Sequence, residues 1–261
     1  MMPMNTAGQT QKPVKAVILA AGYATRLYPL TLNIPKPLLK VTKDKAVIDF
    51  IVEDLAASGR VEEIIVVTNQ KFYSQFLQWS RRANKGVRLS VVNDGTTSNE
   101  DRLGAIGDIH FAVRKKKIAS DFVVVGGDNL FDKVFKKFLA FAAGHRPFAS
   151  LGVFDIRDKK AATRFGVVAA HKDGAVYSFE EKPQHPRSTF VATCLYYFPQ
   201  EVLGLLERYV RDPAASKDAP GNFIRWLWQT GGVYGFRLRH GFWYDIGHFD
   251  SYKEVVARFN R

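Results

Sequence analysis

The chain has 261 residues, with 38 Lys and Arg against 25 Asp and Glu, which gives a formal net charge of +13 at pH 7. Apolar residues make up 46% of the composition, so the chain is not an intrinsically disordered protein. No run approaches the roughly 20 apolar residues that span a bilayer, and residues 1–13 lack the apolar segment of a secretory signal. The single Cys194 excludes an internal disulfide framework and a cysteine-built zinc site. These features indicate a cytoplasmic protein without membrane attachment.

The positive charge is compatible with several kinds of partner. It would attract nucleic acid, an anionic membrane surface or small polyphosphates, or it would only keep the protein soluble. The densest basic run, residues 114–117, follows apolar positions at helical spacing. It therefore predicts a helix C-terminus, where cations interact favourably with the helix dipole. Aromatic residues are not interleaved with the run, so it does not indicate a surface on which bases stack.

The first half of the chain alternates short apolar runs with amphipathic segments. After a flexible tail over residues 1–13, the predicted strands cover residues 14–19, 63–67, 87–92, 122–125 and 149–154. The predicted helices between them cover residues 46–57, 71–83, 102–113 and 133–143. This alternation is typical of βαβ units, which build a mostly parallel sheet covered by helices on both faces.

The second half is richer in strands. Strands are predicted over residues 166–170, 175–179, 189–198 and 233–238, and helices over residues 200–209, 222–229 and 251–259. Lys172-Asp173-Gly174 is a hairpin turn between the first two of these strands. We therefore expect an α/β, Rossmann-like, doubly wound and mostly parallel sheet with a β-rich insertion, in a single domain over residues 14–261.

A loop of small residues follows the first predicted strand, at the edge of the sheet where ligands bind in such folds. It reads Leu19-Ala20-Ala21-Gly22-Tyr23-Ala24-Thr25-Arg26-Leu27. Small residues let the backbone approach a phosphate, Arg26 offers a planar charged group, and Lys36 adds a second cation. The loop matches neither G-x-G-x-x-G nor the Walker A pattern. Spacing alone is equally compatible with an ordinary turn and a solvated Arg26.

Two carboxylates also follow predicted strands. Asp128 lies in Gly127-Asp128-Asn129, after the strand over residues 122–125, and Asp245 lies in the late segment Trp243-Tyr244-Asp245-Ile246-Gly247. Carboxylates that share a site with phosphates are natural ligands for Mg²⁺. Taken in isolation, Asp128 also fits the N-cap of a helix.

In order and spacing, these motifs resemble those of the sugar-1-phosphate nucleotidyltransferases, most closely the glucose-1-phosphate thymidylyltransferase branch. The matching segments are Thr25-Arg26-Leu27, Pro29-Leu30-Thr31, Pro35-Lys36-Pro37, Gly127-Asp128-Asn129, Arg164-Phe165-Gly166-Val167-Val168, Phe179-Glu180-Glu181-Lys182-Pro183 and Trp243-Tyr244-Asp245-Ile246-Gly247. The resemblance covers the chain from Val14 to the last predicted helix. It implies that residues 14–130 mainly bind the nucleotide and that residues 131–261 mainly bind the sugar.

The resemblance also implies roles for individual residues. Arg26 would contact the triphosphate and steady the leaving pyrophosphate, Lys36 would bind phosphates at the reacting centre, and Asp128 and Asp245 would ligate the catalytic Mg²⁺. The nucleotide site would comprise Leu19, Ala20, Ala21, Gly22, Thr25, Arg26, Gly104 and Asp128. The sugar-phosphate site would comprise Asn129, Gly166, Glu181, Lys182 and Thr193.

The chain departs from the family pattern at several positions. Ala24 stands where Gly is usual, and it would cost some energy if the loop needs a positive φ there. Cys194 replaces a Gly and is expected to be a buried small hydrophobe that narrows the sugar site. His248 replaces a Thr; a ligand role is compatible with it, but we expect an ordinary histidine at the surface. The Gln that reads the base in the thymidylyltransferase branch is missing from residues 93–104.

The function implied by the resemblance is transfer of a nucleotidyl group to a sugar-1-phosphate, which yields an NDP-sugar and pyrophosphate. Our best prediction is glucose-1-phosphate with dTTP or UTP. Alternatives are CTP- or GTP-dependent transfer to another sugar or alcohol phosphate, and a non-catalytic relative that binds nucleotides or RNA. We expect the two substrates and Mg²⁺ as ligands, no nucleic acid or membrane as partner, and compatibility with a homo-oligomer.

Overall fold

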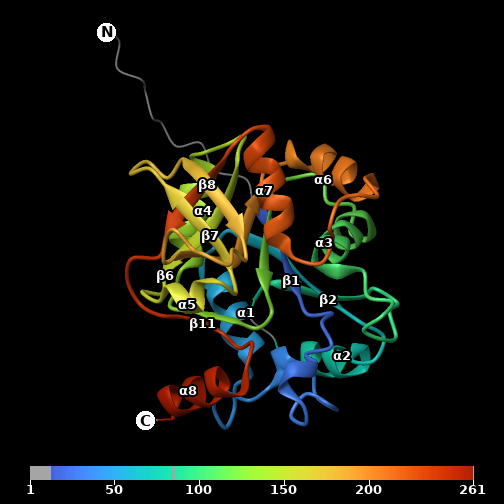
Figure 1. Cartoon of the computed structure of the whole chain (residues 1–261). Helices are drawn as coiled ribbons and strands as arrows, with labels where there is room; N and C mark the ends of the chain where they lie inside the picture. Colours follow the sequence, from blue (N-terminus) through green and yellow to red (C-terminus); the bar gives the residue numbers. More distant parts are fainter. Residues whose placement is uncertain (1–12, 84–85, 261) are drawn as a thin grey trace.

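A computed structural model describes residues 13–83 and 86–260 (Figure 1). Its strands are β1 (Val14–Leu19), β2 (Val61–Thr68), β3 (Arg88–Asn93), β4 (Phe122–Gly126), β5 (Asn129–Phe131), β6 (Ala149–Asp155), β7 (Gly166–Ala170), β8 (Val176–Glu181), β9 (Phe190–Phe198), β10 (Val233–Arg237) and β11 (Trp243–Asp245). Its helices are α1 (Val47–Ala57), α2 (Tyr73–Arg82), α3 (Gly104–Lys115), α4 (Phe135–Ala143), α5 (Lys159–Ala162), α6 (Val202–Arg211), α7 (Pro220–Thr230) and α8 (Phe249–Phe259), with short 3₁₀ turns at Thr25–Leu27 and Lys36–Leu38. Apart from Pro13, the predicted tail lies outside the described residues.

One twisted sheet organises these elements. Its central path runs β10-β6-β9-β4-β1-β2-β3, with β7 beside β9 and β8 beside β7. Along this path the strands pair in parallel except at β9, which runs antiparallel to β4 and to β6. The predicted mostly parallel, doubly wound sheet is thus confirmed, as is the hairpin that joins β7 to β8. Strand β9 does not stay within an insertion, because it lies between β4 and β6 in the main sheet.

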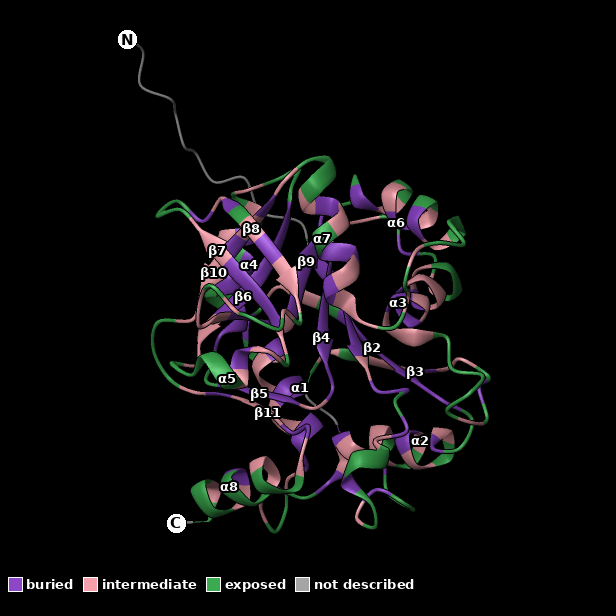
Figure 2. Cartoon of the chain, in the orientation of Figure 1, coloured by how far each residue is buried: buried purple, intermediate pink, exposed green. Residues whose placement is uncertain are grey.

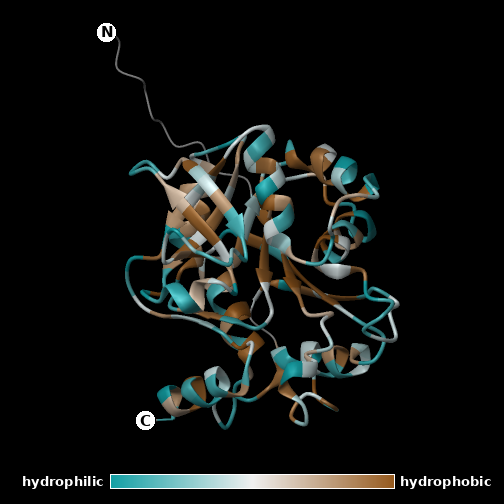
Figure 3. Ribbon diagram, viewed as in Figure 1, coloured by the Kyte–Doolittle hydropathy of each residue, from teal (hydrophilic) through white to brown (hydrophobic). Residues whose placement is uncertain are grey.

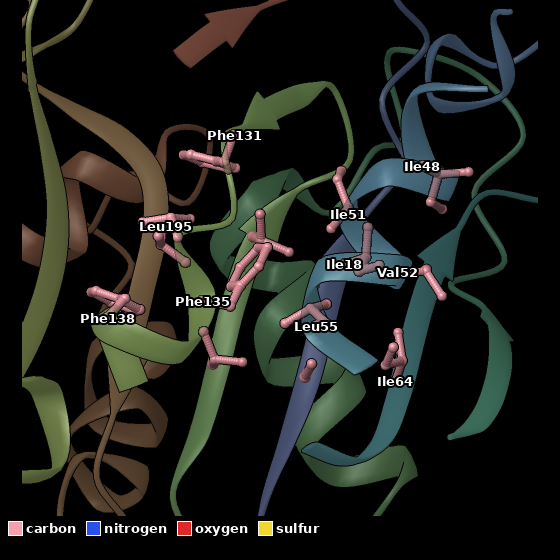
Figure 4. Close-up of a cluster of buried hydrophobic side chains, with 14 of the residues drawn as sticks. Ile18, Ile48, Ile51, Val52, Leu55, Ile64, Phe131, Phe135, Phe138 and Leu195 are labelled. Atoms are coloured by element: carbon pink, nitrogen blue, oxygen red, sulfur yellow. The ribbon is translucent and has the colours of Figure 1, made fainter. Parts of the chain in front are cut away.

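Apolar side chains fill both faces of the sheet. On one face, α1 packs against β1 and β2, and α4 packs beside α1 against β6 and β10. Figure 4 shows Ile51 and Leu55 of α1 close to Ile18 and Ile64. The other face is covered by α3, α6 and α7, which lie together in the upper right of Figure 1. Along β1, Ile18 points to the first layer and its neighbour Val17 to the second, and both are fully buried. Figure 2 shows the strands as the most deeply buried part of the chain.

A second, two-stranded sheet was not predicted. Strands β5 and β11 pair antiparallel, with Asp245 opposite Asn129 and Trp243 opposite Phe131. Strands of three residues are too short to show a periodic pattern, so the sequence does not predict them as strands. This pairing brings the late Trp-Tyr-Asp segment to the tip of β4, where Asp128 lies.

Polar residues lie mainly on the outside of the molecule (Figure 3). The basic run of residues 114–117 begins inside the last turn of α3, as the helical spacing predicted. Among the described residues, no helix is both long and apolar enough to cross a bilayer.

Candidate active site

A cleft of about 410 Å³ opens at the carboxyl ends of β1 and β4. Leu19 and Gly126, the last residues of these strands, are register partners, so the segments that follow them emerge side by side. The cleft is lined by Leu19, Ala20, Ala21, Gly22, Tyr23, Ala24, Thr25, Arg26, Lys36, Pro37, Asp94, Asn99, Arg102, Gly104, Ala105, Asp108, Gly126, Asp128, Cys194, Asp218 and Pro220. All of the predicted nucleotide-binding residues are among them.

The loop after β1 is held by buried polar contacts. Ala24 has φ 49°, so the conformation that favours Gly is adopted here by Ala. The buried Thr31 hydroxyl donates to the Ala24 carbonyl at 2.7 Å, and Asn69 Nδ2 donates to the Ala21 carbonyl at 2.8 Å. Held in this way, the loop leaves Arg26 exposed on the wall of the cleft.

Lys36 and Asp128 form the closest charged contact in the cleft. Lys36 Nζ lies 2.5 Å from Asp128 Oδ2, and Asn129 Nδ2 donates to Asp128 Oδ1 at 2.8 Å. Burial raises the pKa of Asp128, but the Lys36 ammonium outweighs this effect and holds that pKa below its ordinary value. Asn129 is itself fixed, because its Oδ1 accepts a 2.7 Å hydrogen bond from Trp243 Nε1.

Asp245 lies next to this pair. The Ile246 amide donates to the Asp128 carbonyl at 3.0 Å, so the two acidic segments are joined through the backbone. Burial and the nearby Asp128 carboxylate raise the pKa of Asp245 to about 6. Lys36, Arg26 and Arg164 act in the opposite direction. Two carboxylates that repel each other beside several cations make a site suited to a divalent cation and phosphates.

The donor set fits Mg²⁺ better than zinc. Among residues 13–83 and 86–260, no group of three or more His, Cys, Asp or Glu side chains is placed to hold a metal. Mg²⁺ commonly takes one or two carboxylates and completes its shell with substrate phosphates and water. Asp128 and Asp245 are two carboxylates that fit this requirement.

The predicted sugar-phosphate residues differ in their surroundings: Glu181 and Lys182 lie next to each other, whereas Thr193 is bonded within the sheet. Glu181 has a side chain that is 12% exposed. Cys194, expected to be buried, is half-buried. Burial is the largest cause that raises the pKa of its thiol, and the carboxylates of Asp128, Asp245 and Glu181 add to the increase. A raised thiol pKa argues against Cys194 as a nucleophile. Lys182 is more exposed, with Nζ 4.0 Å from Glu181 Oε1. Thr193 instead is buried and donates to the Gly152 carbonyl at 3.2 Å.

The end of the cleft towards β3 and α3 carries a half-buried carboxylate, Asp94, and a buried one, Asp108. Asp94 follows β3 and accepts hydrogen bonds from the amide and hydroxyl of Thr96. Asp108, on α3, is 7% exposed. Burial and the Asp94 carboxylate raise the pKa of Asp108 to about 8. Gly104, at the start of α3, has φ 77° and packs against the backbone of Lys217.

A small separate core lies beneath the charged residues. It contains Leu27, Leu39, Leu130 and Ile246, together with Val41, Val47 and Val255. Leu27 follows Arg26, Ile246 follows Asp245, and Leu130 lies two residues after Asp128. Arg26, Asp128 and Asp245 are therefore each followed within two residues by a side chain of the same cluster.

Sequence reasoning missed several residues of the site. His248 was expected at the surface; it is half-buried, and burial and the cations Arg26, Arg164 and Lys36 lower the pKa of its imidazole. Arg164 belongs to a recognised motif and could have been inferred from it. Asp94, Asp108 and the start of α7 carry no local signal, because only the folded chain brings them to the cleft.

Comparison with known proteins gives a consistent result. A model of the nucleotidyl transferase family matches residues 15–260. A glucose-1-phosphate adenylyltransferase of Clostridium perfringens is 27% identical over 94% of this chain and 66% of its own length. The catalytic subunit beta of mannose-1-phosphate guanylyltransferase from Danio rerio is 28% identical over 90% of this chain and 61% of its own length. The chain thus spans about two thirds or less of these relatives.

The fold also has a solved counterpart. A crystal structure of a proposed glucose-1-phosphate thymidylyltransferase from Bacillus anthracis, in complex with sucrose, superposes with a TM-score of 0.81. The match covers 94% of each chain at 21% sequence identity. This likeness supports the arrangement of the sheet and its helices.

Proposed function

The chain belongs to the nucleotidyl transferase family, and we propose that it transfers a nucleotidyl group from a nucleoside triphosphate to a sugar-1-phosphate. An oxygen of the sugar phosphate attacks the α-phosphorus, a new P–O bond forms, and the α–β bridging P–O bond breaks. Pyrophosphate leaves with the electron pair, and an NDP-sugar remains. As the first substrate pair we propose glucose-1-phosphate with dTTP or UTP.

One observation carries this proposal. Arg26, Lys36 and Asp128 line a single cleft at the ends of β1 and β4. The small β5–β11 sheet places Asp245 next to Asp128, because Asp245 pairs with Asn129. Such a site combines cations that neutralise phosphate charge with a pair of carboxylates suited to Mg²⁺. No side chain in it is activated as a nucleophile, which agrees with direct transfer rather than a covalent intermediate.

Each residue then has a definite task. Arg26 binds the triphosphate and stabilises the departing pyrophosphate, and Lys36 binds phosphates at the reacting centre. Asp128 and Asp245 would hold Mg²⁺, which would supply positive charge to neutralise the phosphates. Glu181 accepts hydrogen bonds from the sugar hydroxyls, and Lys182 binds the sugar phosphate. Most of the catalytic power would come from positioning and electrostatics.

A screen for pyrophosphate release tests this function directly. The purified chain would be assayed with five nucleoside triphosphates against a panel of sugar-1-phosphates in the presence of Mg²⁺. We expect release with at least one pair, and the identity of that pair assigns base and sugar. Absence of release across the whole panel would refute the proposed activity.

Two substitutions then test the assignment of the site. We expect Asp128→Asn and Arg26→Ala to abolish turnover while the thermal unfolding transition is retained. Exposed residues provide matched controls, and we expect Asp44→Asn and Arg81→Ala to keep wild-type activity. Full activity of either cleft variant would contradict the assignment. The expectations of a homo-oligomer and of no nucleic-acid partner are tested by light scattering and by RNA binding at varied salt.

A further inference from the structure

Two glycines enclose the Glu181 carboxylate. An ideal Cβ built on Gly221 would overlap Glu181 Oε2 and lie 2.6 Å from Glu181 Cδ. A Cβ built on Gly166 would lie 3.0 Å from the same Oε2 and 2.7 Å from Cζ of Phe179. Real Cβ atoms essentially never approach heavy atoms below 3.0 Å, so any larger residue at position 221 must displace the carboxylate.

Gly221 belongs to no motif that the sequence analysis singled out. It is the second residue of α7, whose first residue, Pro220, lines the cleft. Its φ is not in the left-handed region, so the backbone itself does not require glycine. Alanine is intrinsically the better helix former by about 1 kcal/mol, so glycine here is unfavourable for the helix alone. What glycine provides at this position is room for Glu181.

The start of α7 is also a favourable place for a carboxylate. The first backbone N–H groups of a helix carry partial positive charge, which stabilises a nearby anion. Glu181 is largely buried, and burial raises its pKa, while Lys182 and Arg225 lower it. The carboxylate is therefore confined between β7 and α7, on the side of the cleft where Cys194 and Pro220 lie.

We propose that Gly221 is a positioning residue for the sugar-1-phosphate site, because its missing side chain lets α7 hold the Glu181 carboxylate in place. This inference rests on the proposed function of Glu181. The atoms that would clash belong to the far end of a flexible side chain. We therefore expect Gly221→Ala to displace the carboxylate without unfolding the chain. The substitution thus acts on recognition of the sugar and not on the nucleotide or on folding.

A double-mutant cycle tests this role. Four chains are compared with glucose-1-phosphate, or with the sugar-1-phosphate identified by the screen, as the probe: wild type, Gly221→Ala, Glu181→Ala and the double variant. We expect Gly221→Ala to raise KM for the sugar phosphate about tenfold or more, as for loss of a hydrogen bond to a charged group. We expect KM for the nucleoside triphosphate to change by less than about twofold, and the Tm to stay or rise.

The cycle also separates positioning from a general structural effect. In the Glu181→Ala background no carboxylate is left to displace, so adding Gly221→Ala should change KM no further. Gly204→Ala on α6 is the matched control, because a Cβ there meets nothing within 4 Å, and we expect wild-type kinetics.

Three results would overturn the inference. If Gly221→Ala kept the wild-type KM for the sugar phosphate, any displacement of the carboxylate would have no effect on sugar binding. An equal penalty in both backgrounds would show that position 221 acts through something other than Glu181. If Glu181→Ala kept the wild-type KM for the sugar phosphate, Glu181 would not bind the sugar, and Gly221 would have no such carboxylate to position. That last result leaves nucleotidyl transfer standing, because turnover and its loss in Asp128→Asn test the transfer separately.

Discussion

Replacing Trp243 by Phe should weaken the carboxylate site through a relay of two hydrogen bonds. Trp243 Nε1 donates to Asn129 Oδ1 at 2.7 Å, and Asn129 Nδ2 donates to Asp128 Oδ1 at 2.8 Å. Phe lacks the indole N–H, so the amide oxygen of Asn129, a residue only 3% exposed, loses its donor. The side chain of Asn129 is then fixed less firmly, so its hydrogen bond to Asp128 weakens.

The magnitude follows from burial. A buried acceptor left without its donor costs about 1–3 kcal/mol. The indole also packs against Phe154 and Phe165 at ring-centroid distances of 5.7 and 5.4 Å, so a smaller ring leaves a void that adds roughly 1 kcal/mol. We expect a total loss of about 2–4 kcal/mol in the free energy of unfolding. Outer partners of metal ligands typically change metal affinity or activity by roughly 10- to 100-fold.

Trp79→Phe is the matched control. Its Nε1 donates to Asp49 Oδ1 at 2.8 Å, so the same chemical change is made away from the cleft. Urea unfolding reports stability, and pyrophosphate release at varied Mg²⁺ reports the site. We expect both variants to lose stability but only Trp243→Phe to need more Mg²⁺, by about tenfold. The reasoning is refuted if the two variants show the same dependence on Mg²⁺.

Two further predictions concern stability. Ala24 has φ 49°, a strain of about 1–2 kcal/mol for an L-residue, so we expect Ala24→Gly to raise the free energy of unfolding by up to about 1 kcal/mol after the added chain entropy of glycine. A lower urea midpoint would contradict this. Asp108, with its pKa raised to about 8 from 3.8, binds a proton in the folded state that the unfolded chain releases. The free energy of unfolding therefore falls from about pH 4 to pH 8 as that proton is lost. Asn does not titrate, so between about pH 6 and pH 9 we expect the free energy of unfolding of Asp108→Asn, measured in urea, to rise relative to that of wild type by about 1 kcal/mol or more. If the two free energies changed in parallel with pH, the prediction would be wrong.

The fold was largely predictable because its strands are buried on both faces. A strand such as β4, whose residues Phe122–Gly126 are all buried, gives an unbroken apolar run bounded by polar residues. The short β5 and β11 gave no such run, and their pairing joins segments more than 100 residues apart in the chain. The antiparallel direction of β9 was likewise invisible, because strand direction depends on the connections and not on composition.

The site was predictable to the extent that its residues sit in ordered motifs. Arg26, Lys36 and Asp128 line one cleft as expected, and Asp245 lies beside them. Asn129 was assigned to the sugar, and that role stays a prediction; in the structure its Nδ2 donates to Asp128 Oδ1 and its Oδ1 accepts from Trp243 Nε1. The proposed role of Gly221 could not be predicted from the sequence, because it depends on where the Glu181 side chain of β8 lies relative to α7.

The small core under the cleft couples parts of the chain that are remote in sequence. Val255 of α8 packs in the same cluster as Leu27 and Leu39, the Tyr252 hydroxyl donates to the Lys40 carbonyl at 2.7 Å, and Asn260 Nδ2 donates to the Val41 carbonyl at 2.8 Å. Figure 1 shows α8 reaching away from the main body beside these loops. Because Arg26, Asp128 and Asp245 each stand within two residues of a member of this cluster, we expect local opening of the cluster to displace all three side chains together. The larger core supports the same cleft from another side, because Trp243, which holds Asn129, packs there.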